Sequence, residues 1–223
     1  MAATQTDSRR AEALEKLCRT YWFPIYVYVR CLGHDSEDAR DLTQAFFARV
    51  LEKRYLDSAD RNKGKFRSFL LTILKGFLAN EWDRDHRLKR GGGCEIIPLD
   101  DESTEARYRT EVIDEAIPES AFQRRWAITL LDQVLNRLES ELVVEDKGDF
   151  FNALKPFLTG DGEGTAYAEI ASTLAMTEGA LRVAVHRLRQ RYRELLRFEI
   201  AQTVSCPEEI DEEIRCLFAA LAS

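Results

Sequence analysis

The residues best placed to do chemistry are a row of cationic side chains late in the sequence. Arg182, His186, Arg189 and Arg193 recur every three or four residues. On an α-helix this spacing puts them on one face, because a helix turns once in about 3.6 residues. Arginine can bond guanine edges in bidentate fashion or clamp phosphate groups. This arginine row therefore predicts a contact with nucleic acid, and the alternative is an ordinary solvated helix face.

An apolar row on the same stretch shows how the arginine row would be held in place. It follows the same spacing one residue earlier and comprises Leu181, Val185, Leu188, Tyr192 and Leu195. A helix that buries this row presents the cations about 100° around its surface. Thr177 is a good N-cap for this helix, and the apolar pattern of residues 167–174 predicts a short helix just before it. These are the parts of a helix-turn-helix.

The charge of the chain is strongly segregated. The formal net charge is −7, but residues 61–90 carry nine Lys and Arg, and residues 178–197 carry six Arg against two Glu. Between these stretches, residues 95–119 hold nine acids against two Arg. Two basic stretches separated by an acidic one favour two contacts with a polyanion.

The three glycines at 91–93 mark the clearest break along the chain. We predict an all-α protein with two small helical domains joined by an acidic linker, the C-terminal one a helix-turn-helix. The predicted segments are a helical domain at 9–93, the acidic linker at 94–119, the second domain at 120–198 and a C-terminal helical extension at 199–223. Residues 9–31 form one or two helices, since Pro24 marks a bend or a restart, and Ser36 is the expected N-cap of the next helix.

The extension has an apolar row of its own at helical spacing, comprising Ile210, Ile214, Leu217, Phe218 and Leu221. Two interpretations follow. The extension packs back on the second domain, or it docks a regulator or another partner protein.

Several classes of function are disfavoured. The sequence offers no nucleophile–base arrangement, phosphate loop or metal-ligand spacing, so we expect neither an enzyme nor a cofactor. The five cysteines and three histidines are scattered, which favours reduced structural thiols over a metal site. No signal peptide or membrane span is evident, and we expect a cytoplasmic protein.

At residues 167–171, 174, 176–183 and 186–189 the chain resembles the C-terminal promoter-binding region of bacterial RNA polymerase sigma factors. The small extracytoplasmic-function (ECF) type is the most similar. Ala175 departs from the glycine often found in that turn. The first domain resembles the other conserved sigma region: residues 38–47 look like the helix that docks on the polymerase clamp, and residues 64–70 and 80–90 look like the parts that engage the melted −10 element.

The resemblance implies three sets of site residues. For core polymerase they are Asp41, Gln44, Phe47 and Ala48. For the −10 element they are Lys65, Arg67, Asn80, Arg84, Arg87 and Arg90. For the −35 element they are Thr177, Glu178, Ala180, Arg182, Val183, His186, Arg187 and Arg189. The implied partners are core RNA polymerase and promoter DNA, with an anti-sigma factor as a further candidate.

The predicted function is that of a sigma factor, which carries core polymerase to a promoter and helps to melt it. The main alternative is a stand-alone helix-turn-helix regulator, which would bind DNA strongly by itself and leaves the first domain unexplained. A helical interaction protein without a DNA role is a third hypothesis. Because neither basic surface is large, we predict weak, salt-sensitive DNA binding by the free chain and specificity only in the holoenzyme.

Overall fold

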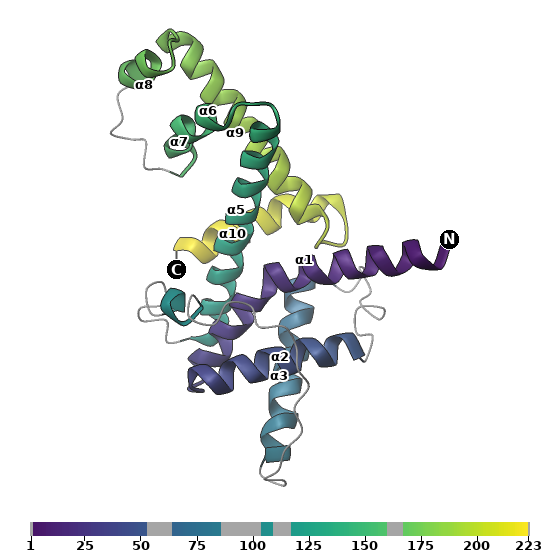
Figure 1. The fold of residues 1–223 in the computed structure, drawn as a ribbon. Helices are drawn as coiled ribbons and strands as arrows, with labels where there is room; N and C mark the ends of the chain where they lie inside the picture. Colours follow the sequence, from purple (N-terminus) through teal and green to yellow (C-terminus); the bar gives the residue numbers. More distant parts are fainter. Residues whose placement is uncertain (1, 53–63, 86–103, 109–116, 160–166, 223) are drawn as a thin grey trace. The chain divides into compact units, whose positions relative to one another are not determined.

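The computed structural model describes residues 2–52, 64–85, 104–108, 117–159 and 167–222, and these ranges are helices joined by short connections (Figure 1). No strand occurs within these ranges, which confirms the all-α prediction. None of the described helices is long and apolar enough to span a membrane. The chain divides into two compact units, one comprising Met1–Thr129 with Thr203–Ser223 and the other Leu130–Gln202.

This division differs from the predicted segments at two places. The boundary lies inside helix α5 (Pro118–Val144) rather than at its start. The first part of α5 carries Phe122 and Trp126, both buried, and Phe122 makes an edge-to-face contact with Tyr28 of α1 at 6.5 Å. Residues 203–223 belong to unit 1 and not to the second unit. Apolar periodicity shows that a helix has a buried face, but it does not show what covers that face.

Unit 1 is built on α1 (Ala2–Cys31), α2 (Ser36–Glu52) and α3 (Phe66–Asp85). Helix α1 continues through Pro24, so the single-helix alternative is the correct one. Asp35 rather than Ser36 caps α2, because its Oδ1 accepts a hydrogen bond from the backbone N–H of Asp38 at 2.8 Å. The largest fully buried side chains of the unit are Tyr26, Phe46, Phe122, Trp126, Ile25, Leu70 and Leu74.

Part of the predicted acidic linker is attached to α1. Residues 104–108 form a short helix. Within it, Glu105 accepts hydrogen bonds from the Tyr26 hydroxyl at 2.6 Å and from Arg30 Nη2 at 3.0 Å. The guanidinium of Arg30 also lies 4.6 Å from the centre of the Tyr108 ring. This acid is therefore engaged with unit 1 and does not belong to an unattached strap.

The tail, residues 203–222, completes unit 1. It consists of a short 3-10 turn (Pro207–Glu209) and α10 (Ile210–Ala222). The backbone N–H of Phe66, at the start of α3, donates to the carbonyl of Thr203 at 3.1 Å, and Leu217 is fully buried. The tail therefore packs within unit 1 and contacts the start of α3, whereas the prediction placed it on the second domain.

Unit 2 comprises the rest of α5 with α6 (Gly148–Leu154), α7 (Pro156–Thr159), α8 (Tyr167–Thr173) and α9 (Glu178–Ala201). Residues 148–159 form two short helices rather than one, with Pro156 opening the second. In Figure 1, α8 and α9 meet at a sharp turn. The core of the unit contains Val134, Leu138, Phe151, Leu154, Leu181, Val185 and Leu195.

Candidate functional site

The turn between α8 and α9 has the geometry expected of a helix-turn-helix. The backbone N–H of Met176 donates to the carbonyl of Ala171 at 2.8 Å, which closes the end of α8. Thr177 caps α9 as predicted, because its hydroxyl accepts from the backbone N–H of Ala180 at 3.2 Å. Ala175 takes a positive φ of 52°, a conformation that glycine adopts without the steric cost paid by other residues. The turn therefore keeps a glycine-type backbone without a glycine.

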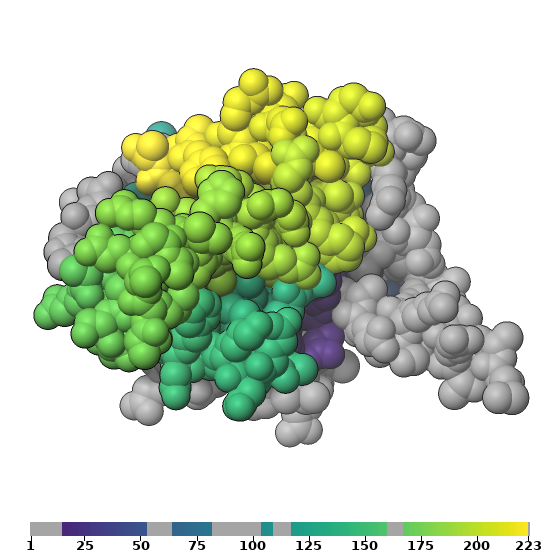
Figure 2. Space-filling model, turned by 90° about the horizontal axis from the view of Figure 1, so that it is seen from above, coloured from purple at the N-terminus to yellow at the C-terminus, as the bar shows by residue number. Residues whose placement is uncertain are grey.

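The predicted faces of α9 are confirmed for most of their residues. Leu181, Val185, Leu188 and Leu195 are buried, and Tyr192 is half-buried with its hydroxyl donating to the Leu131 carbonyl at 3.3 Å. All four members of the arginine row are exposed. Figure 2 shows α9 along the surface of unit 2. The helix is thus held by one side and open to a partner on another.

The exposed arginines of α9 differ in whether another group binds their guanidinium. Arg189 donates two hydrogen bonds to the Phe157 carbonyl, at 3.1 and 2.9 Å, and so ties α9 to α7. Arg182 lies 4.4 Å from the centre of the Tyr167 ring on α8. Among the described residues, Arg187 and Arg193 have no hydrogen-bond or ion-pair partner. Of the predicted set, Arg189 is engaged in bracing the fold, whereas Arg187 is available.

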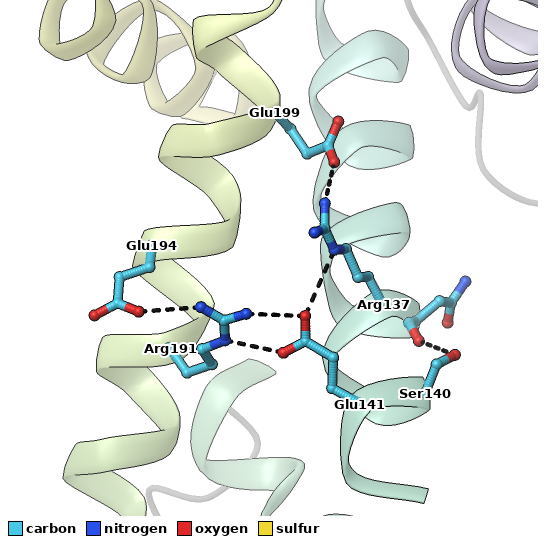
Figure 3. Close-up of polar contacts among 7 residues, drawn as sticks. Arg137, Ser140, Glu141, Arg191, Glu194 and Glu199 are labelled. Carbon is cyan, nitrogen blue, oxygen red and sulfur yellow. Dashed lines mark hydrogen bonds and ion pairs between the residues drawn. The ribbon is translucent and has the colours of Figure 1, made fainter. Parts of the chain in front are cut away.

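A network of ion pairs supports α9 from α5 (Figure 3). Arg191 binds both carboxylate oxygens of Glu141, at 2.9 and 3.0 Å, and reaches Glu194 at 3.3 Å. Arg137 binds Glu199 at 2.9 Å. The hydrogen bonds from Arg191 hold the pKa of Glu141 below its usual range. Exposed pairs are weak one by one, but bidentate geometry and a shared network make them directional.

The −35 set otherwise lies at the open N-terminal part of α9. Thr177, Glu178, Ala180, Arg182, Val183, His186 and Arg187 are all exposed. Val183 is half exposed at 50%. The first turns of α9 thus combine two arginines, a histidine and an apolar side chain on accessible surface.

In unit 1, the first two cations predicted for the −10 element are both paired with an acid, and they are buried (Arg67) or half-buried (Lys65). Arg67 is buried and binds the carboxylate of Glu213 through two hydrogen bonds, from Nε to Oε1 and from Nη2 to Oε2. Lys65 Nζ lies 2.9 Å from Oε2 of the same carboxylate. We call these three residues the buried charge cluster. The guanidinium of Arg67 also packs over the Trp126 ring at 4.7 Å, so burial and pairing both hold it inside.

The remaining −10 residues lie further along α3. Asn80 is exposed and donates to the Gly76 carbonyl at 2.7 Å. It borders a cavity of about 230 Å³ between α2 and α3, which is floored by Phe46, Phe69 and Phe77. Arg84 belongs to α3, but its side chain lies outside the described part of the structure, as do Arg87 and Arg90.

The residues predicted to contact core polymerase are unequally placed on α2. Asp41 is exposed, and Gln44 and Ala48 are half-buried. Phe47 is 5% exposed and packs edge-to-face on Phe46 at 5.7 Å. Phe47 therefore belongs to the core of unit 1 and supports the polar surface of α2 from inside. Its ring could touch a partner protein only if α2 moved away from the helices on which it packs.

The sequence did not identify the acids that pair with the cations of either unit. Glu213 belongs to a run of carboxylates at the start of α10, and nothing in the sequence separates it from exposed Glu212. Glu141 stands 50 residues before Arg191, the residue that it binds. No local spacing links such partners. Within the described residues no group of His, Cys, Asp and Glu could hold a metal ion, and Cys18, Cys31, Cys206 and Cys216 are free thiols.

Comparison with known proteins gives one family. Residues 17–88 match the model of sigma-70 region 2, which covers about a third of the chain. No curated protein and no solved structure matches the chain. The matched segment includes the second half of α1, all of α2 and α3, and with them Asp41, Gln44, Lys65 and Asn80. The comparison therefore shows that this segment is similar to sigma-70 region 2.

Proposed function

We propose that this protein is a sigma factor of the ECF type that binds core RNA polymerase and directs promoter recognition and melting. The observation that carries the proposal is the pairing of a sigma-70 region 2 segment with a separate, capped helix-turn-helix. The region 2 match supports a role in promoter recognition and polymerase binding. The helix-turn-helix of unit 2 lies outside that match and supports a second promoter contact.

Unit 2 would read the −35 element as duplex DNA. Recognition helices place their N-terminal residues in the major groove, and here Arg182, Val183, His186 and Arg187 are exposed in the first turns of α9. A bidentate contact between an arginine and guanine is worth about 1–3 kcal/mol of discrimination. Because Arg189 is bonded to the Phe157 carbonyl, we assign it to the support of the helix and leave base contact to Arg182 and Arg187.

Unit 1 would hold core polymerase and the −10 element. Asp41, Gln44 and Ala48 supply a polar surface on α2 for the polymerase. Asn80 lies at the rim of an aromatic cavity, and a flipped base is typically bound by hydrogen bonds together with aromatic or apolar contacts. Arg84, Arg87 and Arg90 remain proposed phosphate contacts, and Lys65 and Arg67 can join them only when Glu213 no longer holds them.

The proposal is tested by adding the purified chain to bacterial core polymerase and sequencing the run-off transcripts made from a library of promoter fragments. We expect transcripts that start downstream of a shared pair of sequence elements. The D41A/Q44A variant should lose most of this activity. Its control, Glu15→Gln, removes an exposed carboxylate from α1 that lies in none of the three site sets. A chain that adds nothing to core transcription contradicts the proposal.

The alternative, a stand-alone helix-turn-helix regulator, predicts the reverse. In that case the chain without polymerase would protect a specific duplex in a footprint, and its affinity would survive moderate salt. A sigma factor of this kind should give no specific footprint on its own, because its contacts are few and sensitive to salt.

A further inference from the structure

The buried charge cluster has the chemistry of an anion-binding site with its anion already in place. Glu213 is only 1% exposed, and both of its carboxylate oxygens are bound by cations. Arg67 forms a two-pronged contact, and Lys65 Nζ completes it at 2.9 Å. A planar arginine fork with a lysine beside it is also the arrangement by which proteins bind phosphate groups.

The carboxylate of this cluster lies far from the two cations along the sequence. Glu213 follows Arg67 by 146 residues and belongs to α10, whereas Lys65 and Arg67 open α3. The tail also reaches α3 through the bond from Phe66 N–H to the Thr203 carbonyl at 3.1 Å. These contacts of the tail involve residues 65–67, where the first two −10 cations lie.

Glu213 is ionised in this setting. Burial alone would raise the pKa of its carboxyl, but the hydrogen bonds from Arg67 and Lys65 outweigh burial and hold that pKa below its usual range. A negative group thus occupies the cationic start of α3 at neutral pH. Lys65 keeps a second acid, Glu212, at 3.5 Å, but a buried Arg67 without an anion would be strongly unfavourable. Any replacement for Glu213 must therefore itself be anionic.

On these grounds, and resting on the proposed function, we propose that the tail is a built-in blocker of the −10-binding surface. Glu213 occupies the position that a DNA phosphate takes when Lys65 and Arg67 engage the melted strand. Displacement of α10 exchanges one anion for another and leaves the two cations paired. The free protein is then held in a state of low DNA affinity, and promoter engagement releases the tail.

The direct test measures binding of a fluorescent single-stranded DNA 12-mer of mixed sequence to the full chain by anisotropy. The variant Glu213→Gln keeps the shape of the side chain but removes its charge. We expect it to bind about tenfold more tightly than the unaltered chain. The slope of log affinity against log salt should steepen by up to about 1.4, because two more cations engage phosphates at about 0.7 each.

Two further variants make this result specific. Glu208→Gln removes an exposed carboxylate of the same tail, away from the cluster, and should bind within about twofold of the unaltered chain. The double variant E213Q/R67Q should lose most of the gained affinity. A gain of equal size in Glu208→Gln would mean that only net charge matters, and it would overturn the proposal.

A second measurement needs no variant and so avoids any loss of folding in Glu213→Gln. Hydrogen exchange is followed in the tail of the unaltered protein, alone and within the complex of core polymerase with an open promoter. We expect faster exchange in residues 203–222 in the complex. Unchanged or slower exchange there overturns the proposal.

The outcomes separate this proposal from the function on which it rests. In one outcome the chain supports promoter-specific transcription, but Glu213→Gln binds the 12-mer no better and hydrogen exchange in the tail does not rise. The proposal that the tail blocks DNA binding is then wrong, and the proposed sigma function stands. If no variant supports transcription with core polymerase, the proposed function fails and the blocker fails with it.

Discussion

The two units treat their arginines in opposite ways. In unit 2 the first turns of α9 leave Arg187 without a partner among the described residues, while Arg189 and Arg191 bind α7 and α5 and hold the helix in place. In unit 1 Arg67 is buried against Glu213. The comparison shows that a basic stretch of sequence does not by itself make a basic surface. An acid on a distant element decides whether a cation is presented or withheld.

The largest effect should come from removing the buried cation. Arg67→Met leaves Glu213 buried with only Lys65 beside it, and we expect a loss of about 3 kcal/mol in the free energy of unfolding, measured by urea denaturation. Replacing both partners, as in R67M/E213L, should restore most of this loss, since an apolar pair needs no charge compensation. Equal losses in the single and double variants would show that the ion pair is not the cause.

The matching change in unit 2 should leave stability alone and affect recognition. Arg187→Gln alters an exposed side chain without a described partner, so the free energy of unfolding should move by less than about 0.5 kcal/mol. Holoenzyme affinity for a −35 duplex should fall by about 1–3 kcal/mol, with relaxed preference at one base position. A uniform loss over all sequences would instead assign Arg187 to a phosphate.

The turn of unit 2 provides a stabilising change. Ala175→Gly should raise the free energy of unfolding of the unit by about 1 kcal/mol, because alanine at a φ of 52° has a steric cost that glycine does not have. Ala168→Gly, at an exposed position within α8, should lower it by about 0.5–1 kcal/mol. The same substitution is thus expected to act with opposite signs seven residues apart, and melts followed by circular dichroism would detect both.

The smallest effect concerns pH. The pKa of Glu141 is lowered by its hydrogen bonds with Arg191, so its stabilisation is present above its ordinary pKa and is lost as pH falls through the lowered value. Glu141→Gln should therefore be less stable than the unaltered chain at pH 7, by less than about 1 kcal/mol because the pair is largely exposed. The stabilities of the two proteins should converge once the pH lies below the lowered pKa of Glu141. A difference that persists there would mean that packing, not charge, is responsible.

Much of the fold could be predicted from the sequence because it depends on local patterns. The apolar row of α9 and the Thr177 cap follow from spacing within one helix, and both were predicted correctly. Partners far apart in sequence could not be predicted. Nothing local distinguishes Glu213 from Glu212, or indicates that Arg189 reaches the Phe157 carbonyl. Access to Lys65 and Arg67 depends on α10, and the sequence pattern did not indicate that α10 packs against them.

Unit 1 is discontinuous, since its final helix follows all of unit 2 along the chain. A ribosome delivers residues in order from the amino end, so the start of α3 leaves the exit tunnel long before the carboxylate that will neutralise it. Throughout that interval the nascent first unit carries an unmatched arginine. Its final packing must wait until α10 has been translated, and a stop codon after residue 202 would leave the protein permanently in that unfinished condition.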